Sequence, residues 1–319
     1  MALDSDLLID RRRIRRKLTF WRILAAVVAV VAIAAASSGS PGSRGNMIAR
    51  IRIDGLIRSD NARVEALEQL ASSKQSSAVI VHINSPGGTT AGAEQLYDAL
   101  TRLRQKKPVV VVVEGLAASG GYIAALASDR IIAQQTSLVG SVGVLFQYPN
   151  VTDLLKTVGV KMEEIKSSPL KAAPNGYEPT SPEARAALDA LVKDMYAWFK
   201  TMVKDRRGLD DAALEQVSDG RVFTGRQAIG LRLIDEIGDE KAAKAWLVAE
   251  KHISEDLPVR DYKLHPRLSD LSFLRVAASA TLEAVGLHSL AGRLSESGVT
   301  QAIDRLGMDG MLVLWQPAG

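Results

Sequence analysis

Two turns built from small residues follow apolar strands and carry the groups best suited to chemistry. The stretch "NSPGG" at 84–88 follows the apolar run 77–83, and "EGLAASGG" at 114–121 follows the apolar run 108–113. Glycine amides approach a ligand without side-chain obstruction, and a serine among small neighbours is accessible to an acyl group. The two turns together can supply a nucleophile, Ser119, and backbone N–H donors for an oxyanion.

Each turn also has a plainer interpretation. Paired glycines such as Gly87 and Gly88 often form only a tight turn, and a serine before a helix is often only a cap. Position 117 is Ala rather than Gly, so the second turn departs from the hydrolase elbow pattern. A nucleophilic Ser119 therefore needs a base elsewhere in the sequence.

The four histidines are poor candidates for that base. His82 lies within an apolar strand, where a satisfied core imidazole is expected. His252, His265 and His288 come after the region of regular strands and helices in the sequence, and they lack the local setting of a triad base. Lysine is the alternative, because Ser-Lys pairs also act in acyl transfer.

The loop "KSSPLKAAP" at 166–174 offers two lysines. The apolar neighbours of Lys171 favour its burial, whereas Lys166 follows an acidic strand. A lysine accepts a proton only when it is neutral, so a lysine base needs a pKa lowered from about 10.4 to roughly 7–8. No acidic residue lies between Glu164 and Glu178, which agrees with that requirement.

A parallel sheet is needed to bring the two turns together, and the sequence predicts one. Apolar runs alternate with amphipathic helical stretches, which is typical of an α/β fold with buried parallel strands and flanking helices. Ser181 and Pro182 are expected to start a long helix as its N-cap and first residue. We expect strands at 47–53, 78–83, 108–113, 129–133, 142–147 and 159–165, and helices at 62–72, 91–105, 119–128, 151–157 and 182–205.

The N-terminal sequence predicts a membrane location. A basic cytoplasmic N-terminus at 1–17 precedes an apolar stretch at 18–36 and a flexible Ser/Gly/Pro-rich linker at 37–46. A helix over 18–36 would be roughly 28 Å long, close to the thickness of a bilayer core. The positive-inside rule predicts a single-pass protein of the cell (inner) membrane, with its catalytic domain outside the cytoplasm. A signal peptide cleaved near Ala34-Ala35-Ala36 is the alternative.

Composition limits the class of protein. Of the 319 residues, 47% are hydrophobic, enough for one large domain, which we place at 47–255 with a C-terminal helical or tail region at 256–319. Eight of the 40 basic and three of the 36 acidic residues lie within 1–46, so the remainder is nearly neutral and a nucleic-acid partner is not expected. The absence of cysteine excludes disulfides, thiolate catalysis and cysteine zinc sites.

Five motifs occur in order along the chain: "NSPGG" (84–88), "ASGGYIAALASDRI" (118–131), "SLVGSVGV" (137–144), "KSSPLK" (166–171) and "DGRVFTGRQA" (219–228). On these motifs the region from Met47 to Val248 resembles the signal peptide peptidase A family in its short, single-repeat form, within the Clp protease/crotonase superfamily. Each matching motif is weak alone, but five in the same order are specific. Ser168 departs from the pattern, since related sequences usually have Gly there.

The resemblance implies roles for individual residues. Ser119 falls on the nucleophile, Lys171 on the general base and Ser141 on the serine that hydrogen-bonds the lysine. Gly88 and the N–H of Gly120 fall on oxyanion-hole positions. It also implies a membrane-anchored serine endopeptidase that needs no metal or cofactor, acts on remnant signal peptides or other apolar peptides, and forms a homo-oligomer in which neighbouring subunits share sites.

Other interpretations stay open. Val144, Leu145 and Phe146 are candidates for the walls of a substrate pocket, or they are core residues. A related anchored peptidase that trims one membrane protein, a non-catalytic membrane scaffold and a crotonase-like acyl-CoA enzyme are alternative functions. The apolar C-terminal tail, 308–319, could dock on a neighbouring subunit, occupy the substrate groove or pack on its own domain.

Overall fold

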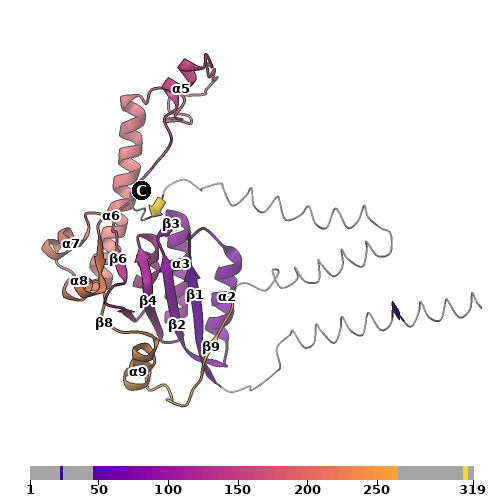
Figure 1. The fold of residues 1–319 in the computed structure, drawn as a ribbon, viewed down its shortest axis with the longest axis vertical. Coiled ribbons are helices and arrows are strands. Elements are labelled where there is room, and N and C mark those ends of the chain that lie inside the picture. Colours follow the sequence, from indigo (N-terminus) through magenta and orange to yellow (C-terminus); the bar gives the residue numbers. More distant parts are fainter. Residues whose placement is uncertain (1–21, 24–45, 265–311, 315–319) are drawn as a thin grey trace, which may run out of the picture. The chain divides into compact units, whose positions relative to one another are not determined.

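The structure is a computed structural model that describes residues 22–23, 46–264 and 312–314 (Figure 1). Contacts divide the chain into a unit of residues 1–45 and a unit of residues 46–319. The predicted anchor lies outside the described residues, apart from Arg22 and Ile23. Within the described ranges, no helix has the length and apolar character required to cross a bilayer.

The described strands form one large, mostly parallel sheet and one small two-stranded sheet. They are β1 (Met47–Asp54), β2 (Ser76–Ser85), β3 (Gly87–Thr89), β4 (Val109–Ala118), β5 (Arg130–Ala133), β6 (Leu138–Gly140), β7 (Val222–Thr224), β8 (Glu236–Ile237), β9 (Val259–Asp261) and β10 (Leu312–Leu314). The large sheet has the order β7-β6-β4-β2-β1-β9, and β5 pairs with both β4 and β8. Of its pairings only β6 with β7 is antiparallel. The small sheet pairs β10 with β3.

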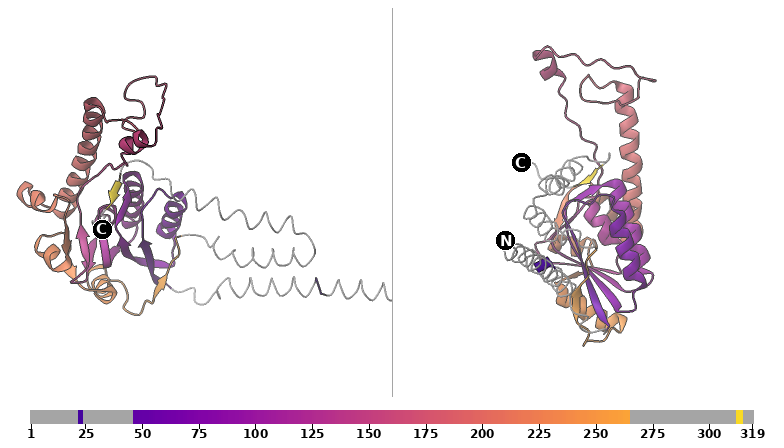
Figure 2. Two further views of the ribbon diagram at one scale, coloured as in Figure 1. Left: turned by 45° about the horizontal axis from the view of Figure 1, so that its top comes forward. Right: turned by 90° about the vertical axis from the view of Figure 1, so that its right-hand side faces the viewer.

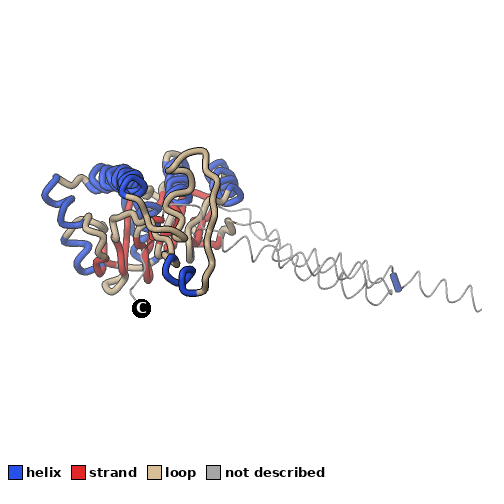
Figure 3. The backbone as a smooth tube through the Cα atoms, turned by 90° about the horizontal axis from the view of Figure 1, so that it is seen from above, coloured by secondary structure: helices blue, strands red, loops and turns tan. Residues whose placement is uncertain are grey.

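Helices cover both faces of the large sheet (Figures 2 and 3). They are α2 (Asn61–Ser72), α3 (Thr90–Arg104), α4 (Gly120–Leu126), α5 (Thr152–Thr157), α6 (Pro182–Arg207), α7 (Asp211–Val217), α8 (Gly225–Gly230) and α9 (Glu240–Lys251). The main core lies between one face and α2, α3, α4 and the last part of α6, whereas α9 covers a smaller core on the other face. Because both faces of the sheet are covered, the central strands β2 and β4 are buried along most of their length.

The predicted α/β fold is confirmed, but two predicted strands are wrong. Residues 142–147 leave the sheet because the backbone turns at Gly140 and Ser141, both at positive φ. Residues 159–165 form an irregular chain whose apolar side chains, such as those of Val160 and Met162, are exposed. Alternating apolar residues make a strand only where a neighbouring strand can pair with them.

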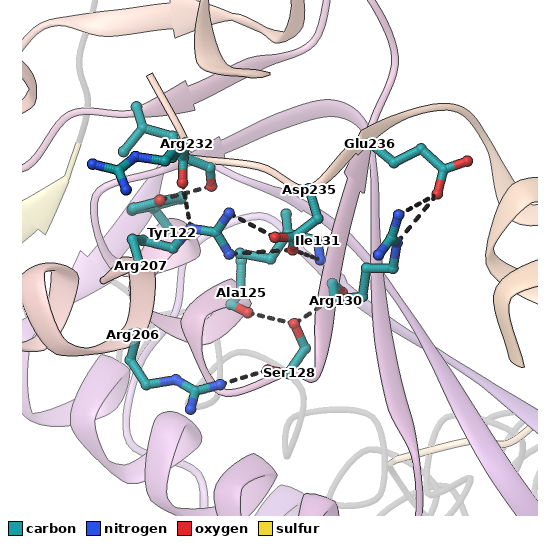
Figure 4. Close-up of polar contacts among 11 residues, drawn as sticks. Tyr122, Ala125, Ser128, Arg130, Ile131, Arg206, Arg207, Arg232, Asp235 and Glu236 are labelled. Carbon is teal, nitrogen blue, oxygen red and sulfur yellow. Dashed lines mark hydrogen bonds and ion pairs between the residues drawn. The ribbon is translucent and has the colours of Figure 1, made fainter. Parts of the chain in front are cut away.

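The end of α6 is fixed to the core by arginines (Figure 4). Arg206 donates a 2.7 Å hydrogen bond to the carbonyl of Leu126, the last residue of α4. It donates a second, of 2.6 Å, to the carbonyl of Ser128. Arg207 pairs with Asp235 at 2.7 Å. Hydrogen bonds to ionised groups are stronger than neutral ones, so these contacts attach α6 firmly beside α4. The last part of α6 also buries Phe199 and Val203.

The first part of α6 points away from this attachment. Figures 1 and 2 show α5 and the loop after it at the end of α6 that lies away from the sheet. Ser181 caps α6 by accepting a hydrogen bond from Ala184 N, and Pro182 occupies the first turn, as predicted. We call residues 151–181 the arm. It extends from the domain and holds both lysines of the 166–174 loop.

A polar cluster lies on the face of the sheet covered by α9. Arg50 donates two hydrogen bonds of 2.5 Å to the Glu240 carboxylate, and His82 Nε2 lies 2.7 Å from the same carboxylate. His82 is buried, so Glu240 provides the partner expected for a core imidazole. The hydrogen bond from Arg50 outweighs desolvation and lowers the pKa of Glu240 below its ordinary value.

Replacing Glu240 by Gln should weaken the dependence of stability on acid pH. A carboxylate with a depressed folded pKa stabilises the fold above its unfolded pKa, about 4.3, and loses this contribution as pH falls through the folded value. We expect Glu240→Gln to cost about 1–3 kcal/mol at neutral pH. Its further loss of stability below about pH 4 should be smaller than in the wild type.

Thermal unfolding of the full chain across this pH range measures the effect. Asp189→Asn, which removes an exposed ion pair with Lys193, is the control and should change little. Equal losses at acid pH in wild type and Glu240→Gln would contradict the assignment.

Candidate active site

Ser119 occupies a sharp turn between β4 and α4. Its φ is +55°, a conformation uncommon for residues other than glycine. Ser119 N donates a 2.7 Å hydrogen bond to Gly140 O, and Ser119 O accepts bonds of 2.9 Å from Tyr122 N and Ile123 N. These bonds hold the predicted strand-to-helix turn at the carboxyl edge of the sheet. Strain of this kind often accompanies function.

The Ser119 hydroxyl lacks a hydrogen-bond partner among the described residues. Ser119 is only 1% exposed, and its Oγ is buried. A buried polar group without a partner is costly, so such groups are rare and need an explanation. A hydroxyl kept ready for a base or a substrate is one explanation.

The second turn orients the N–H of Gly88. Gly87 has a φ of +105°, and its carbonyl accepts a 2.8 Å hydrogen bond from Ile57 N. Because a trans peptide is planar, the N–H of Gly88 points away from Ile57. A Cβ at Gly88 would lie 1.8 Å from Ile57 O, so this position accepts only glycine. No side chain lies on the Gly88 amide, and its role in an oxyanion hole stays a prediction.

Parallel pairing of β2 with β4 places the two turns side by side. Ser85 lies opposite Ala117 in the sheet register, so each turn starts from a neighbouring strand end. A Cβ at Gly121 would lie 2.7 Å from Ser85 O, which shows how closely α4 approaches the first turn. The sheet therefore brings Gly88, Ser119 and Gly120 to one edge.

Ser141 belongs to the same edge. Gly140 lies opposite Ala118 in the register, so the residues that follow each, Ser141 and Ser119, leave neighbouring strands. Ser141 has a φ of +54°, and its N–H donates a 2.8 Å bond to Arg221 O. The structure therefore gathers four of the predicted residues, Gly88, Ser119, Gly120 and Ser141.

Lys171 is not gathered with them in the described chain. It lies exposed in the arm, where its backbone N–H donates a 3.1 Å hydrogen bond to Ser168 O. Lys166 pairs instead with Glu164 and Glu178, and these hydrogen bonds raise the pKa of Lys166. Acidic partners keep Lys166 protonated and so disfavour it as a base. Lys171 as the base stays a prediction.

The three residues suggested for a pocket are half-buried and lie in irregular chain after Ser141. Val144 packs against the main core, which agrees with the plainer interpretation for that residue. The ring of Phe146 lies 5.9 Å from that of Tyr148. The pocket role of Leu145 and Phe146 stays a prediction. Among the described residues, no group of acidic and histidine side chains is arranged to hold a metal ion.

The chain end supplies a neighbour of Gly88 that local sequence patterns did not specify. β10 pairs antiparallel with β3, and Val313 lies opposite Gly88. Ile57 bridges β3 on its other edge, so the Gly88 N–H points towards the side of β10. The apolar run of the tail was the signal in the sequence, but its pairing partner was not predictable from it. The rest of the C-terminal region from 265 lies outside the described residues.

Family models match most of the described domain. The model of peptidase family S49 matches residues 101–254, and the Clp protease model matches residues 48–139. The first therefore includes Ser119, Ser141 and Lys171, and the second includes both turns. Neither match rests on the N-terminal segment or the tail.

Three relatives illustrate the similarity. A provisionally named protease of Synechocystis sp. is 36% identical over 201 residues, which are 62% of this chain and 72% of that protein. A provisionally named signal peptide peptidase SppA of Enterococcus faecium is 30% identical over 62% of this chain and 57% of its own length. The chloroplastic serine protease SPPA of Arabidopsis thaliana is 27% identical over 78% of this chain and 37% of its own length.

Removal of the tail, residues 308–319, is expected to raise the peptidase rate severalfold. β10 lies along the edge of β3 to which the Gly88 N–H points, and a peptide substrate would add as a strand at the same edge. Peptidase rate and oligomer mass of the full and shortened chains measure the effect.

Single substitutions sharpen this test. Val313→Pro removes a backbone N–H and should also raise the rate, whereas Val313→Ala keeps the N–H and serves as the control. An unchanged or lower rate after deletion, at constant oligomer mass, would contradict competition between tail and substrate. A changed mass would instead favour docking on a neighbouring subunit.

Proposed function

The chain belongs to peptidase family S49 and is a serine peptidase. We propose that it is a membrane-anchored endopeptidase that degrades remnant signal peptides or other apolar peptides outside the cytoplasm. The observation that carries this proposal is the buried Ser119 hydroxyl, which has no hydrogen-bond partner among the described residues and lies in a strained turn beside the Gly87-Gly88 turn. A nucleophile and backbone N–H donors at one sheet edge suit acyl transfer.

The reaction would take two acyl-transfer steps. Ser119 Oγ attacks the peptide carbonyl while a neutral Lys171 amine accepts the hydroxyl proton. The N–H groups of Gly88 and Gly120 hold the negative oxygen that forms. Lys171 then gives the proton to the leaving amine as the C–N bond breaks. A water molecule, activated by the same lysine, releases the acyl group from Ser119.

We propose that Lys171 reaches Ser119 from a neighbouring chain, with Ser141 orienting its amine. Two features support a shared site. The Ser119 hydroxyl has no partner from the described part of its own chain, and Lys171 lies exposed in an arm that extends away from the sheet edge. In an assembly, the arm of one chain would extend over the site of the next and bury the lysine there, as a base requires.

The surface of the arm suits such an assembly. Its exposed large hydrophobic side chains are those of Leu154, Val158, Val160, Met162, Ile165, Leu170 and Tyr177, and those of Leu154, Val158 and Ile165 are more than 60% exposed. Exposed apolar groups gathered on one segment usually mark a contact surface. A second copy of the chain would cover this surface and place Lys171 in the same step. Homo-oligomer formation is thus a condition of activity in this proposal.

The membrane location rests on the sequence of the N-terminal segment. An apolar stretch at 18–36 preceded by a basic run would anchor the chain with its site outside the cytoplasm. Peptides left in the membrane after export would then be close to the enzyme. The similarity to a protein provisionally named signal peptide peptidase SppA supports the same class of substrate.

The function is tested with the full chain in detergent. We expect the wild type to cleave a synthetic signal peptide and to leave a folded control protein intact. Ser119→Ala and Lys171→Ala should each lower the rate at least about a thousandfold, because both residues act in the same proton transfer. Lys166→Ala is the matched control and should retain most of the activity. Cleavage by Ser119→Ala at the wild-type rate would rule out the proposed nucleophile.

Mixing the two inactive variants tests whether sites are shared. If the serine and lysine come from different chains, co-assembly of Ser119→Ala with Lys171→Ala rebuilds some sites that hold both groups. In a random equal mixture about a quarter of serine and lysine pairs would be intact, so the activity should return to that order. A mixture as inactive as either variant alone, despite proven exchange of subunits, would show that each site belongs to one chain.

A further inference from the structure

Ser85, in the "NSPGG" turn, lies between the two groups that the proposed reaction requires. It ends β2, is fully buried, and lies opposite Ala117 near the end of β4. Its carbonyl oxygen and Cβ lie directly against Gly121, at the start of α4. Ser85 therefore contacts the turn of the nucleophile through its backbone.

The side chain of Ser85 contacts the other turn. Its hydroxyl donates a 2.7 Å hydrogen bond to Gly55 O and accepts a 3.1 Å hydrogen bond from Gly87 N. The second acceptor nearby, Gly87 O, lies 3.4 Å away, so the single hydroxyl proton goes to Gly55. One side chain thus satisfies the Gly87 amide and attaches it to the loop after β1.

This attachment fixes the direction of the Gly88 amide. Gly87 has a φ of +105°, and glycine has wide freedom of rotation at such an angle. Two hydrogen bonds restrict that freedom. The Gly87 N–H donates to Ser85 Oγ, and the Gly87 carbonyl accepts from Ile57 N. The Gly88 N–H belongs to the same planar peptide as the Gly87 carbonyl, so it is held in one direction.

We propose that Ser85 is a positioning residue for the oxyanion hole, an inference that rests on the proposed function. Its hydroxyl holds the Gly88 N–H at a fixed place relative to Ser119, and its backbone holds α4 against the same turn. Oxyanion stabilisation depends on donors that are already in place when charge develops. Loss of the hydroxyl leaves the Gly87 N–H without this partner and removes one of the two hydrogen bonds that restrict the turn.

The test compares Ser85→Ala with Ser128→Ala in the full chain. Ser128 is also buried, and its hydroxyl lies 2.8 Å and 3.0 Å from the carbonyl oxygens of Ala125 and Arg130, neither of which belongs to the two turns. Both variants should lose comparable thermal stability. Active sites are counted by labelling with a fluorophosphonate, so that partial unfolding does not affect the rate for each site.

Three quantities are measured for each variant with an apolar peptide and a peptide aldehyde of the same sequence. For Ser85→Ala we expect kcat per labelled site to fall about 10- to 100-fold, less than the 10²–10³ typical of removing an oxyanion donor outright. KM should change less than about twofold. The inhibition constant of the aldehyde, which forms a tetrahedral adduct, should rise by about the factor lost from kcat/KM. Ser128→Ala should match the wild type in all three.

Equal kcat and equal aldehyde inhibition in the two variants would overturn the proposal and leave Ser85 a structural residue. If Ser85→Ala yields too little folded protein, Ser85→Cys replaces it, since sulfur fills similar space but bonds weakly. The same rise in the inhibition constant is expected, and its absence would also overturn the proposal. Failure of the proposed function is distinct, because wild type and Ser119→Ala would then cleave at the same rate.

Discussion

Close contact between two turns at the carboxyl edge of the sheet is the constraint on which the site depends. A Cβ at Gly121 would lie 2.7 Å from Ser85 O, where the two turns meet, and a Cβ at Gly88 would lie 1.8 Å from Ile57 O in the loop after β1, so neither position has room for a side chain. Only backbones without side chains approach so closely. The contact of Gly121 with Ser85 sets the turn that holds Gly88 beside the Ser119 turn, and the parallel pairing of β2 with β4 maintains it.

The rest of the fold supports this edge in two ways. Buried apolar strands and the helices on both faces make a rigid base, and α4 starts directly at Ser119. Arg206 and Arg207 then fix α6 beside α4, so the arm extends from the part of the core that carries the nucleophile. A rigid attachment is what an arm needs if it is to place a lysine accurately in another subunit.

The sequence allowed prediction of the features that depend on local pattern. Long apolar runs identified β2 and β4, and small residues around Ser119 identified its turn. Two strands, 142–147 and 159–165, were predicted wrongly. The second has the apolar alternation of a strand but lacks a neighbouring strand to pair with. Contacts between distant segments were not predictable, such as β10 with β3 and the bond from Ser85 to Gly55. Both depend on tertiary placement, which periodicity does not encode.

The central claim is that Lys171 of one chain meets Ser119 of another, and a cross-link between chains tests it most directly. The chain contains no cysteine, so introduced thiols react without background. One form would carry Ser119→Cys and another Lys171→Cys, and their co-assembly would be treated with a short bifunctional maleimide. The account predicts a cross-linked dimer only when both forms are present. No such dimer, together with a cross-link inside single chains that carry both substitutions, would contradict it.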